Sequence, residues 1–109
     1  MESKDALAAL SSLSQETRLS AYRHLIAAGR KGASAGALAA ALDVPAPTLS
    51  FHLKELEHAG MIASARSGRS IVYTANFERM RELLSYLMDD CCGGRPEICD
   101  LAVRESSCA

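Results

Sequence analysis

The chain has 109 residues, of which 49% are hydrophobic and 5% aromatic, and it contains no tryptophan. That length suffices for one domain with its own hydrophobic core and is too short for two. Much of the apolar content is alanine and leucine, which favours packed helices over a β-sandwich. The composition therefore predicts a single, mainly helical domain.

The formal net charge of −1 and the isoelectric point near 6.3 lack the strongly basic balance of a typical nucleic-acid-binding domain. The charge is unevenly spread, because residues 17–75 hold seven Lys or Arg against three Asp or Glu, a local charge of +4. A basic middle between acidic ends is compatible with a nucleic-acid face, and nearly as well with an ordinary solvated surface.

No run of about 18 apolar residues is present to span a bilayer, and the first residues lack the basic start and cleavage site of a signal peptide. We therefore expect a cytoplasmic protein with no membrane partner. All four cysteines follow residue 90. In a reducing cytosol such cysteines suit metal, metalloid or redox chemistry better than structural disulfides.

Apolar residues at helical spacing predict a first helix over residues 4–13, with Leu7 and Leu10 on one face. Ser14 offers a cap for a second helix, which should end near residues 29–32 and whose apolar stripe is Leu19, Tyr22, Leu25 and Ile26. Ser34 can cap a short third helix, whose inner face would hold Leu38 and Leu42.

A helix-turn-helix is predicted where Asp43-Val44-Pro45 interrupts the third helix and Pro47 fits the first turn of a fourth. One face of the fourth helix would hold Leu49, Leu53 and Leu56, and Gly60 would end the helix. We expect the opposite face to hold Thr48, Ser50, His52 and Lys54. Such a helix can enter the major groove of DNA.

From residue 61 to residue 75 the apolar period shortens to about two, which predicts a β-hairpin. The run Ile71-Val72-Tyr73-Thr74 would pair with the strand that begins at Ile62, and Arg66 and Arg69 would lie at the tip. Cations at a hairpin tip can hold the DNA backbone or probe the minor groove. Asn76 can cap a last helix through residue 89, with a narrow apolar seam of Phe77, Met80, Leu84 and Leu87.

Three segments resemble the ArsR/SmtB family of winged-helix repressors, namely SLSQETRLSAYRHL, PAPTLSFHLKELEHAGMI and SGRSIVYTA. The resemblance covers roughly residues 10–87. It implies a mainly α winged helix-turn-helix with the order helix-helix-helix-helix-strand-strand-helix. It also implies a homodimer held by the first and last helices, which binds a palindromic operator in double-stranded DNA and represses transcription.

Carried onto this chain, the family pattern assigns Thr48, Ser50, Phe51 and His52 to the DNA face, and Arg66 and Arg69 to the wing. Two interpretations of Phe51 stay open, since an aromatic ring there can contact a thymine methyl group or pack against the wing. No nucleophile is grouped with a base in the sequence, so we expect no enzyme.

The cysteines form a second candidate site. Cys91, Cys92 and Cys99 lie in one short segment together with Gly93 and Gly94. Such a segment can curl back on itself. As(III) and Sb(III) prefer a pyramid of three soft thiolates, whereas zinc usually takes four ligands in spaced C-x-x-C pairs. We assign these three cysteines to a metalloid inducer and treat Cys108 as dispensable. The chain then divides into a DNA-binding and dimerisation domain, residues 1–90, and a cysteine-containing tail, residues 91–109.

The assignment of the cysteines to a metalloid departs from two metal-site patterns known in the ArsR/SmtB family. Arsenic repressors of the best-known type carry C-x-C-D before the turn, where this chain has Ala40-Ala41-Leu42-Asp43, and the last helix lacks the histidines of the zinc pattern. A C-terminal Cys-Cys followed by a third cysteine is similar to arsenite-responsive members whose site lies beyond the last helix. The alternative is a redox or persulfide sensor of the same fold, which would cross-link two of the thiols.

Overall fold

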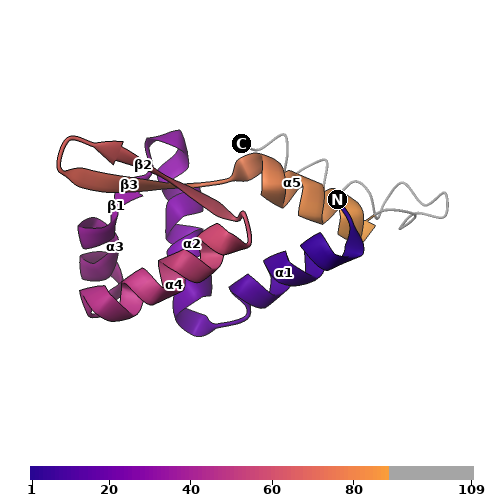
Figure 1. The fold of residues 1–109 in the computed structure, drawn as a ribbon, viewed down its shortest axis with the longest axis horizontal. Coiled ribbons are helices and arrows are strands. Elements are labelled where there is room, and N and C mark those ends of the chain that lie inside the picture. The colour runs from indigo at the N-terminus through magenta and orange to yellow at the C-terminus, as the bar shows by residue number, and fades with distance from the viewer. Residues whose placement is uncertain (89–109) are drawn as a thin grey trace.

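The computed structural model describes residues 1–88, and the predicted boundary at residue 90 and the cysteine tail lie outside them. The elements, shown in Figure 1, are α1 (Ser3–Leu13), α2 (Glu16–Ala28), the 3-10 turn η1 (Gly29–Lys31), β1 (Ala33–Ser34), α3 (Ala35–Leu42), α4 (Ala46–His58), β2 (Ile62–Ser67), β3 (Ser70–Ala75) and α5 (Phe77–Met88). The predicted mainly α fold with a β-hairpin wing is confirmed, and β1 is an addition to it.

The junction between α1 and α2 lies where the sequence predicts it, but a different residue caps α2. The side chain of Gln15 accepts a 2.9 Å hydrogen bond from the backbone N–H of Arg18. Ser14 instead ends α1, because its backbone N–H and its hydroxyl both donate to the carbonyl of Ser11. The prediction of Ser14 as the cap of the second helix is therefore wrong, since its hydroxyl serves the preceding helix.

The three strands form one antiparallel sheet in the order β1-β3-β2. Ile62 pairs with Ala75 and Ser67 with Ser70, so the hairpin closes through the two residues Gly68 and Arg69. Gly68 has φ 63° at the first turn position, where a type II′ turn takes glycine.

β1 is two residues long and lies against β3, with Ala33 paired to Tyr73. The approach depends on Gly32, which has φ 71°. A Cβ at Gly32 would collide with the carbonyl oxygen of Tyr73 and lie 2.6 Å from Cγ2 of Thr74. Only glycine fits where the chain passes so close to β3.

The core lies mainly between α2, α3, α4 and the hairpin, and it includes Ala6 and Ala9 of α1 and Leu83 of α5. The three leucines of α4 are all buried, as predicted, and the largest fully buried side chains are Leu25, Leu38, Leu49, Leu53, Leu56, Met61 and Leu83. The predicted stripe of α2 is correct for Tyr22 and Leu25, whereas Leu19 and Ile26 are exposed. The small residue Ala21 takes the buried position instead.

α1 and α5 lie side by side and extend away from the helix-turn-helix, as Figure 1 shows. The predicted seam of α5 is divided between two environments: Phe77 and Met80 pack against the core, while Leu87 is 51% exposed. Leu83, which the seam omitted, is the buried residue of α5. No helix within residues 1–88 is long and apolar enough to cross a membrane.

Candidate nucleic-acid interface

The turn between α3 and α4 is set by two residues. Asp43 adopts a left-handed conformation with φ 55°, which aspartate tolerates better than most side chains, and its N–H donates to the last carbonyls of α3. Pro47 lies in the first turn of α4, as predicted. Together they start α4 at the surface beside α3, in the arrangement of a helix-turn-helix.

The exposed side of α4 differs from the predicted polar face. A helix turns by about 100° per residue, so residues at every second position cannot share one face. His52 lies on the flank toward α2, where it contacts Arg18, and Ser50 lies on the flank that carries Glu57. The residues of α4 that are exposed and were assigned to DNA are Thr48, Ser50, Phe51 and Lys54, whereas His52 is half-buried.

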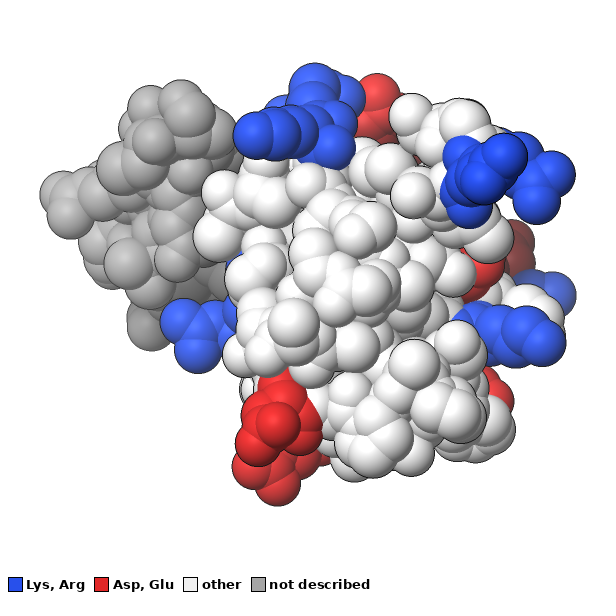
Figure 2. All heavy atoms as spheres, turned by 90° about the vertical axis from the view of Figure 1, so that its left-hand side faces the viewer, with Lys and Arg blue, Asp and Glu red and all other residues white. Residues whose placement is uncertain are grey.

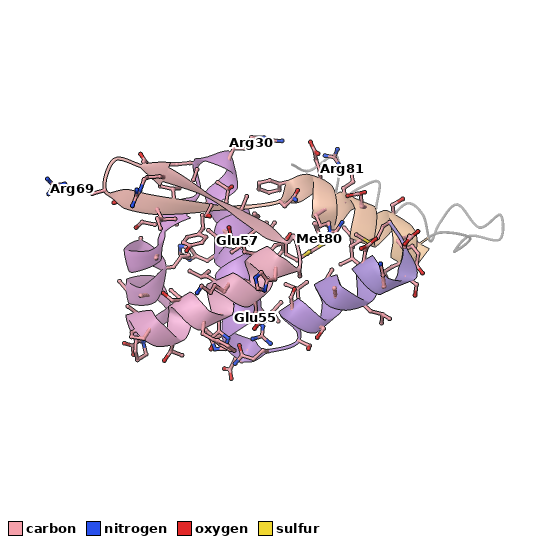
Figure 3. All side chains as sticks on the ribbon, viewed as in Figure 1. Arg30, Glu55, Glu57, Arg69, Met80 and Arg81 are labelled. Carbon is pink, nitrogen blue, oxygen red and sulfur yellow. The ribbon has the colours of Figure 1, made fainter. Side chains whose placement is uncertain are left out.

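The flank of α4 toward the wing is joined to the hairpin. The hydroxyl of Ser64 on β2 donates a 2.7 Å hydrogen bond to Oε2 of Glu57. Figure 3 shows Glu57 on this side of α4, with Arg69 at the outer tip of the hairpin. Arg66 and Arg69 are both exposed, so the wing offers two cations beside α4.

Figure 2 shows the end of the molecule that carries the hairpin tip and α3. Most of the lysines and arginines lie along its upper and right-hand edges around an uncharged centre, with some carboxylates among them, and a larger group of carboxylates lies at the lower left. Arg30 differs from the wing cations, because its guanidinium lies 5.7 Å from the ring centroid of Phe77 and so packs against α5. The surface therefore combines separated cations with apolar and hydroxyl groups, which suits contacts to both phosphates and base edges.

Phe51 remains 58% exposed. Its ring meets the ring of His52 in an edge-on arrangement with centroids 5.4 Å apart. The ring is therefore accessible from outside the chain, and both interpretations of Phe51 stay predictions.

His52 is tied to α2 by Arg18, a relationship that the sequence did not indicate. Nη1 of Arg18 lies 3.0 Å from Nδ1 of His52, and Nε of Arg18 donates to the carbonyl of Ser12 at 2.7 Å. Burial and the charge of Arg18 lower the pKa of His52 below its ordinary value of 6.5, although Glu55 opposes this shift. The lowered pKa favours the neutral form of His52 above pH 6.5.

Asn76 is the predicted cap of α5, and its side chain accepts a 3.1 Å hydrogen bond from the N–H of Arg79. It also has a second role that the sequence did not show. Its Nδ2 donates to the carbonyl of Gly60 at 3.0 Å, and its N–H donates to the carbonyl of Met61 at 2.8 Å. The start of α5 is thus fixed to the turn between α4 and β2.

The predicted metalloid ligands Cys91, Cys92 and Cys99 lie outside the described residues. Within residues 1–88 no group of three His, Cys, Asp or Glu side chains is placed to hold a metal ion.

A family profile described as a helix-turn-helix domain matches residues 13–65. An ArsR-like transcriptional regulator from Rhodococcus sp. RHA1 is 26% identical and has a TM-score of 0.71, over 94% of this chain and 92% of its own. Two structures of HlyU from Vibrio cholerae N16961, one of them of the reduced protein, are each 28% identical with a TM-score of 0.63. They cover 80% of this chain, and 97% and 92% of their own.

A more distant likeness supports the fold alone. It is the homodimeric winged helix-turn-helix DNA-binding domain of Mb0332 from Mycobacterium bovis, a possible ArsR-family transcriptional regulator, which is 20% identical. Its TM-score is 0.65, over 84% of this chain and 85% of its own. No curated protein matches the chain by sequence.

The matched segment runs from the end of α1 into β2 and so contains the turn, α4 and the first strand of the wing. The likeness to the Rhodococcus regulator extends over nearly the whole chain, including α1 and α5. The chain therefore contains a helix-turn-helix domain within a winged helix-turn-helix fold, and over nearly its whole length it is similar to an ArsR-like transcriptional regulator.

Proposed function

We propose that this protein is a transcriptional repressor that binds a palindromic operator as a homodimer. The observation that carries the proposal is the exposed side of α4, with Thr48, Ser50 and Phe51 near its N-terminal end and a cationic wing beside it. The first residues of such a helix reach base edges, while cations at the wing hold phosphates. In this interpretation α4 is the recognition helix.

The test is selection of a duplex from a random-sequence pool by the full-length reduced protein, followed by a binding titration at several salt concentrations. Enrichment of an inverted repeat, with half-sites about one or two helical turns apart, supports the proposal. Failure to enrich any sequence over the starting pool contradicts it.

Dimerisation is supported by the apolar surface that α1 and α5 leave uncovered within one chain. Leu7 is 64% exposed and Leu10 40% on α1, and Tyr86 and Leu87 are exposed on α5. Clustered apolar side chains of this size usually mark an interaction surface. The Mycobacterium bovis relative is a homodimer, which agrees with self-association of this chain.

The proposed inducer is As(III) or Sb(III), bound by the thiolates of Cys91, Cys92 and Cys99. The chemistry of three closely spaced thiols supports it. So does their place in the sequence, because Cys91 follows three residues after the end of α5. The start of α5 is hydrogen-bonded through Asn76 to the turn that follows α4, so a change at the tail could reach the DNA-binding surface along the length of α5.

A redox or persulfide response of the same thiols is the second candidate. It is favoured by the likeness to HlyU, whose reduced form has a structure of its own. Titration of the reduced protein with arsenite separates the two candidates. One equivalent per chain, thiolate-ligand absorbance and release of the duplex support the metalloid, whereas release by oxidant or persulfide alone supports the sensor.

A further inference from the structure

The guanidinium of Arg18 connects two elements that are far apart in the sequence. It lies in the first turn of α2, donates through Nε to the carbonyl of Ser12 at the end of α1, and places Nη1 3.0 Å from Nδ1 of His52 on α4. A guanidinium has five donors, no acceptor, and does not lose its proton in proteins. Nδ1 of His52 is therefore the acceptor in this contact.

This contact decides which ring nitrogen of His52 carries the proton. A neutral imidazole has one N–H and one lone pair, so a ring that accepts at Nδ1 has its hydrogen on Nε2. Nε2 has no hydrogen-bond partner among the residues that the structure describes, and it is not one of their buried, unpartnered atoms. The N–H is thus free to donate outward from the flank of α4 that also carries Thr48.

We propose that Arg18 is a positioning residue for DNA recognition, which holds His52 in the Nε2–H form so that this N–H donates to an acceptor on DNA. The inference rests on the proposed DNA-binding function. The acceptors that fit are guanine N7 or O6 on a base edge and the oxygens of a phosphate. Because Arg18 fixes the ring before DNA arrives, His52 loses little conformational freedom on binding. Arg18 itself need not touch DNA.

The tautomer is measured first, by ¹⁵N NMR of the His52 ring in the full-length reduced protein above pH 7. We expect the Nε2–H form to dominate in the wild type. In Arg18→Met, which keeps an unbranched apolar stem and removes every donor, we expect a mixture of both forms. Arg23→Met is the matched control, because Arg23 is an exposed arginine of the same helix, and it should leave the His52 signals unchanged. A dominant Nδ1–H form in the wild type would overturn the proposal.

DNA binding is measured with the duplex enriched from the random pool and with a random-sequence duplex of equal length. Arg18→Met should weaken binding to the enriched duplex by about tenfold, the loss expected for one net hydrogen bond. If the acceptor is a base edge, binding to the random duplex should change much less. If it is a phosphate, both should weaken equally. In the background of His52→Ala, Arg18→Met should have no further effect.

A direct contact between Arg18 and a phosphate predicts a different result, in which the two substitutions add and Arg18→Met alone lowers the salt dependence by about one unit. That result would overturn the proposal. His52→Asn keeps the test valid if Arg18→Met unfolds, because asparagine retains an acceptor near Nδ1 and lacks the outer N–H. His52→Asn should lose as much affinity as His52→Ala, and wild-type affinity in this variant would exclude the Nε2 donor. Failure of the wild type to enrich any duplex would instead contradict the proposed function, whichever tautomer the spectrum shows.

Discussion

Ser64 and Glu57 link the wing to the recognition helix through a hydrogen bond of 2.7 Å between hydroxyl and carboxylate. The bond is exposed and contributes only about 1 kcal/mol. The start of β2 is held more strongly, because its first residue, Ile62, is 3% exposed and packs in the core. The wing and α4 are therefore held in one arrangement, and we expect that the wing cations can be removed without moving α4.

Arg69→Ala and Arg66→Ala should each lower the salt dependence of DNA binding by about one unit, because each removes one cation from a phosphate. The sequence of the preferred duplex should stay the same, because a phosphate contact carries no base information. Binding titrations from about 50 to 200 mM salt check this. Arg30→Ala is the comparison variant, since Arg30 packs on Phe77, and it should leave the salt slope unchanged. Unaltered slopes in both wing variants would remove the wing from the interface.

Leu87→Glu should weaken the dimer about tenfold or more. Leu87 is 51% exposed within one chain, and we expect the dimer to bury it. A glutamate there would bury a charge without a partner, and two-fold symmetry would repeat this cost in both subunits. Sedimentation equilibrium measures the dissociation constant. Leu19→Glu changes a leucine of similar exposure on α2 and should leave it unaltered. A monomer that binds the inverted repeat as tightly as the wild type would contradict the dimer.

Acid should weaken the contact between Arg18 and His52. The pKa of His52 is lowered in the folded protein, so the contribution of this residue to stability is complete above pH 6.5. As the pH falls from 6.5 through the lowered pKa, the unfolded chain takes up a proton first, and the free energy of unfolding decreases. Urea titrations of the wild type and His52→Asn between pH 5 and 8 isolate the effect. Parallel pH profiles of the two proteins would show that His52 does not contribute.

Cys99→Ser should leave DNA binding intact and abolish its release by arsenite, because a pyramidal As(III) site needs three thiolates. Cys91→Ser and Cys92→Ser should behave alike, and Cys108→Ser should respond as the wild type does. Anisotropy of a labelled duplex during arsenite titration measures the release. Full release in Cys99→Ser would exclude the assigned ligand set.

Local patterns in the sequence were enough to predict the helix-turn-helix, the hairpin and the cap of α5. Leu49, Leu53 and Leu56 follow the helical period, and Asn76 directly precedes an amphipathic run. Each of these two signals is contained in a short window of sequence. β1 could not be predicted in this way, because a strand of two residues shows no period and its pairing with β3 depends on Gly32 lying against Tyr73.

The polar face of α4 was predicted with a spacing of two, which a helix cannot place on one side. The contact between Arg18 and His52 could not be predicted from the sequence for a different reason. The two residues are 34 positions apart, and their meeting follows from how α2 packs against α4. A histidine among polar residues of a recognition helix looks the same in sequence whether it is free or held.

The hydrogen bonds of Asn76 also bear on how the protein opens. Its side chain and backbone together engage Gly60, Met61 and Arg79, so unwinding of the first turn of α5 would release the carbonyls of Gly60 and Met61 in the turn that follows α4. Segments that share such bonds exchange their amide hydrogens as one unit. The amides of Asn76 and Arg79 should then have similar protection factors, and a ligand that frays the start of α5 would lower both together.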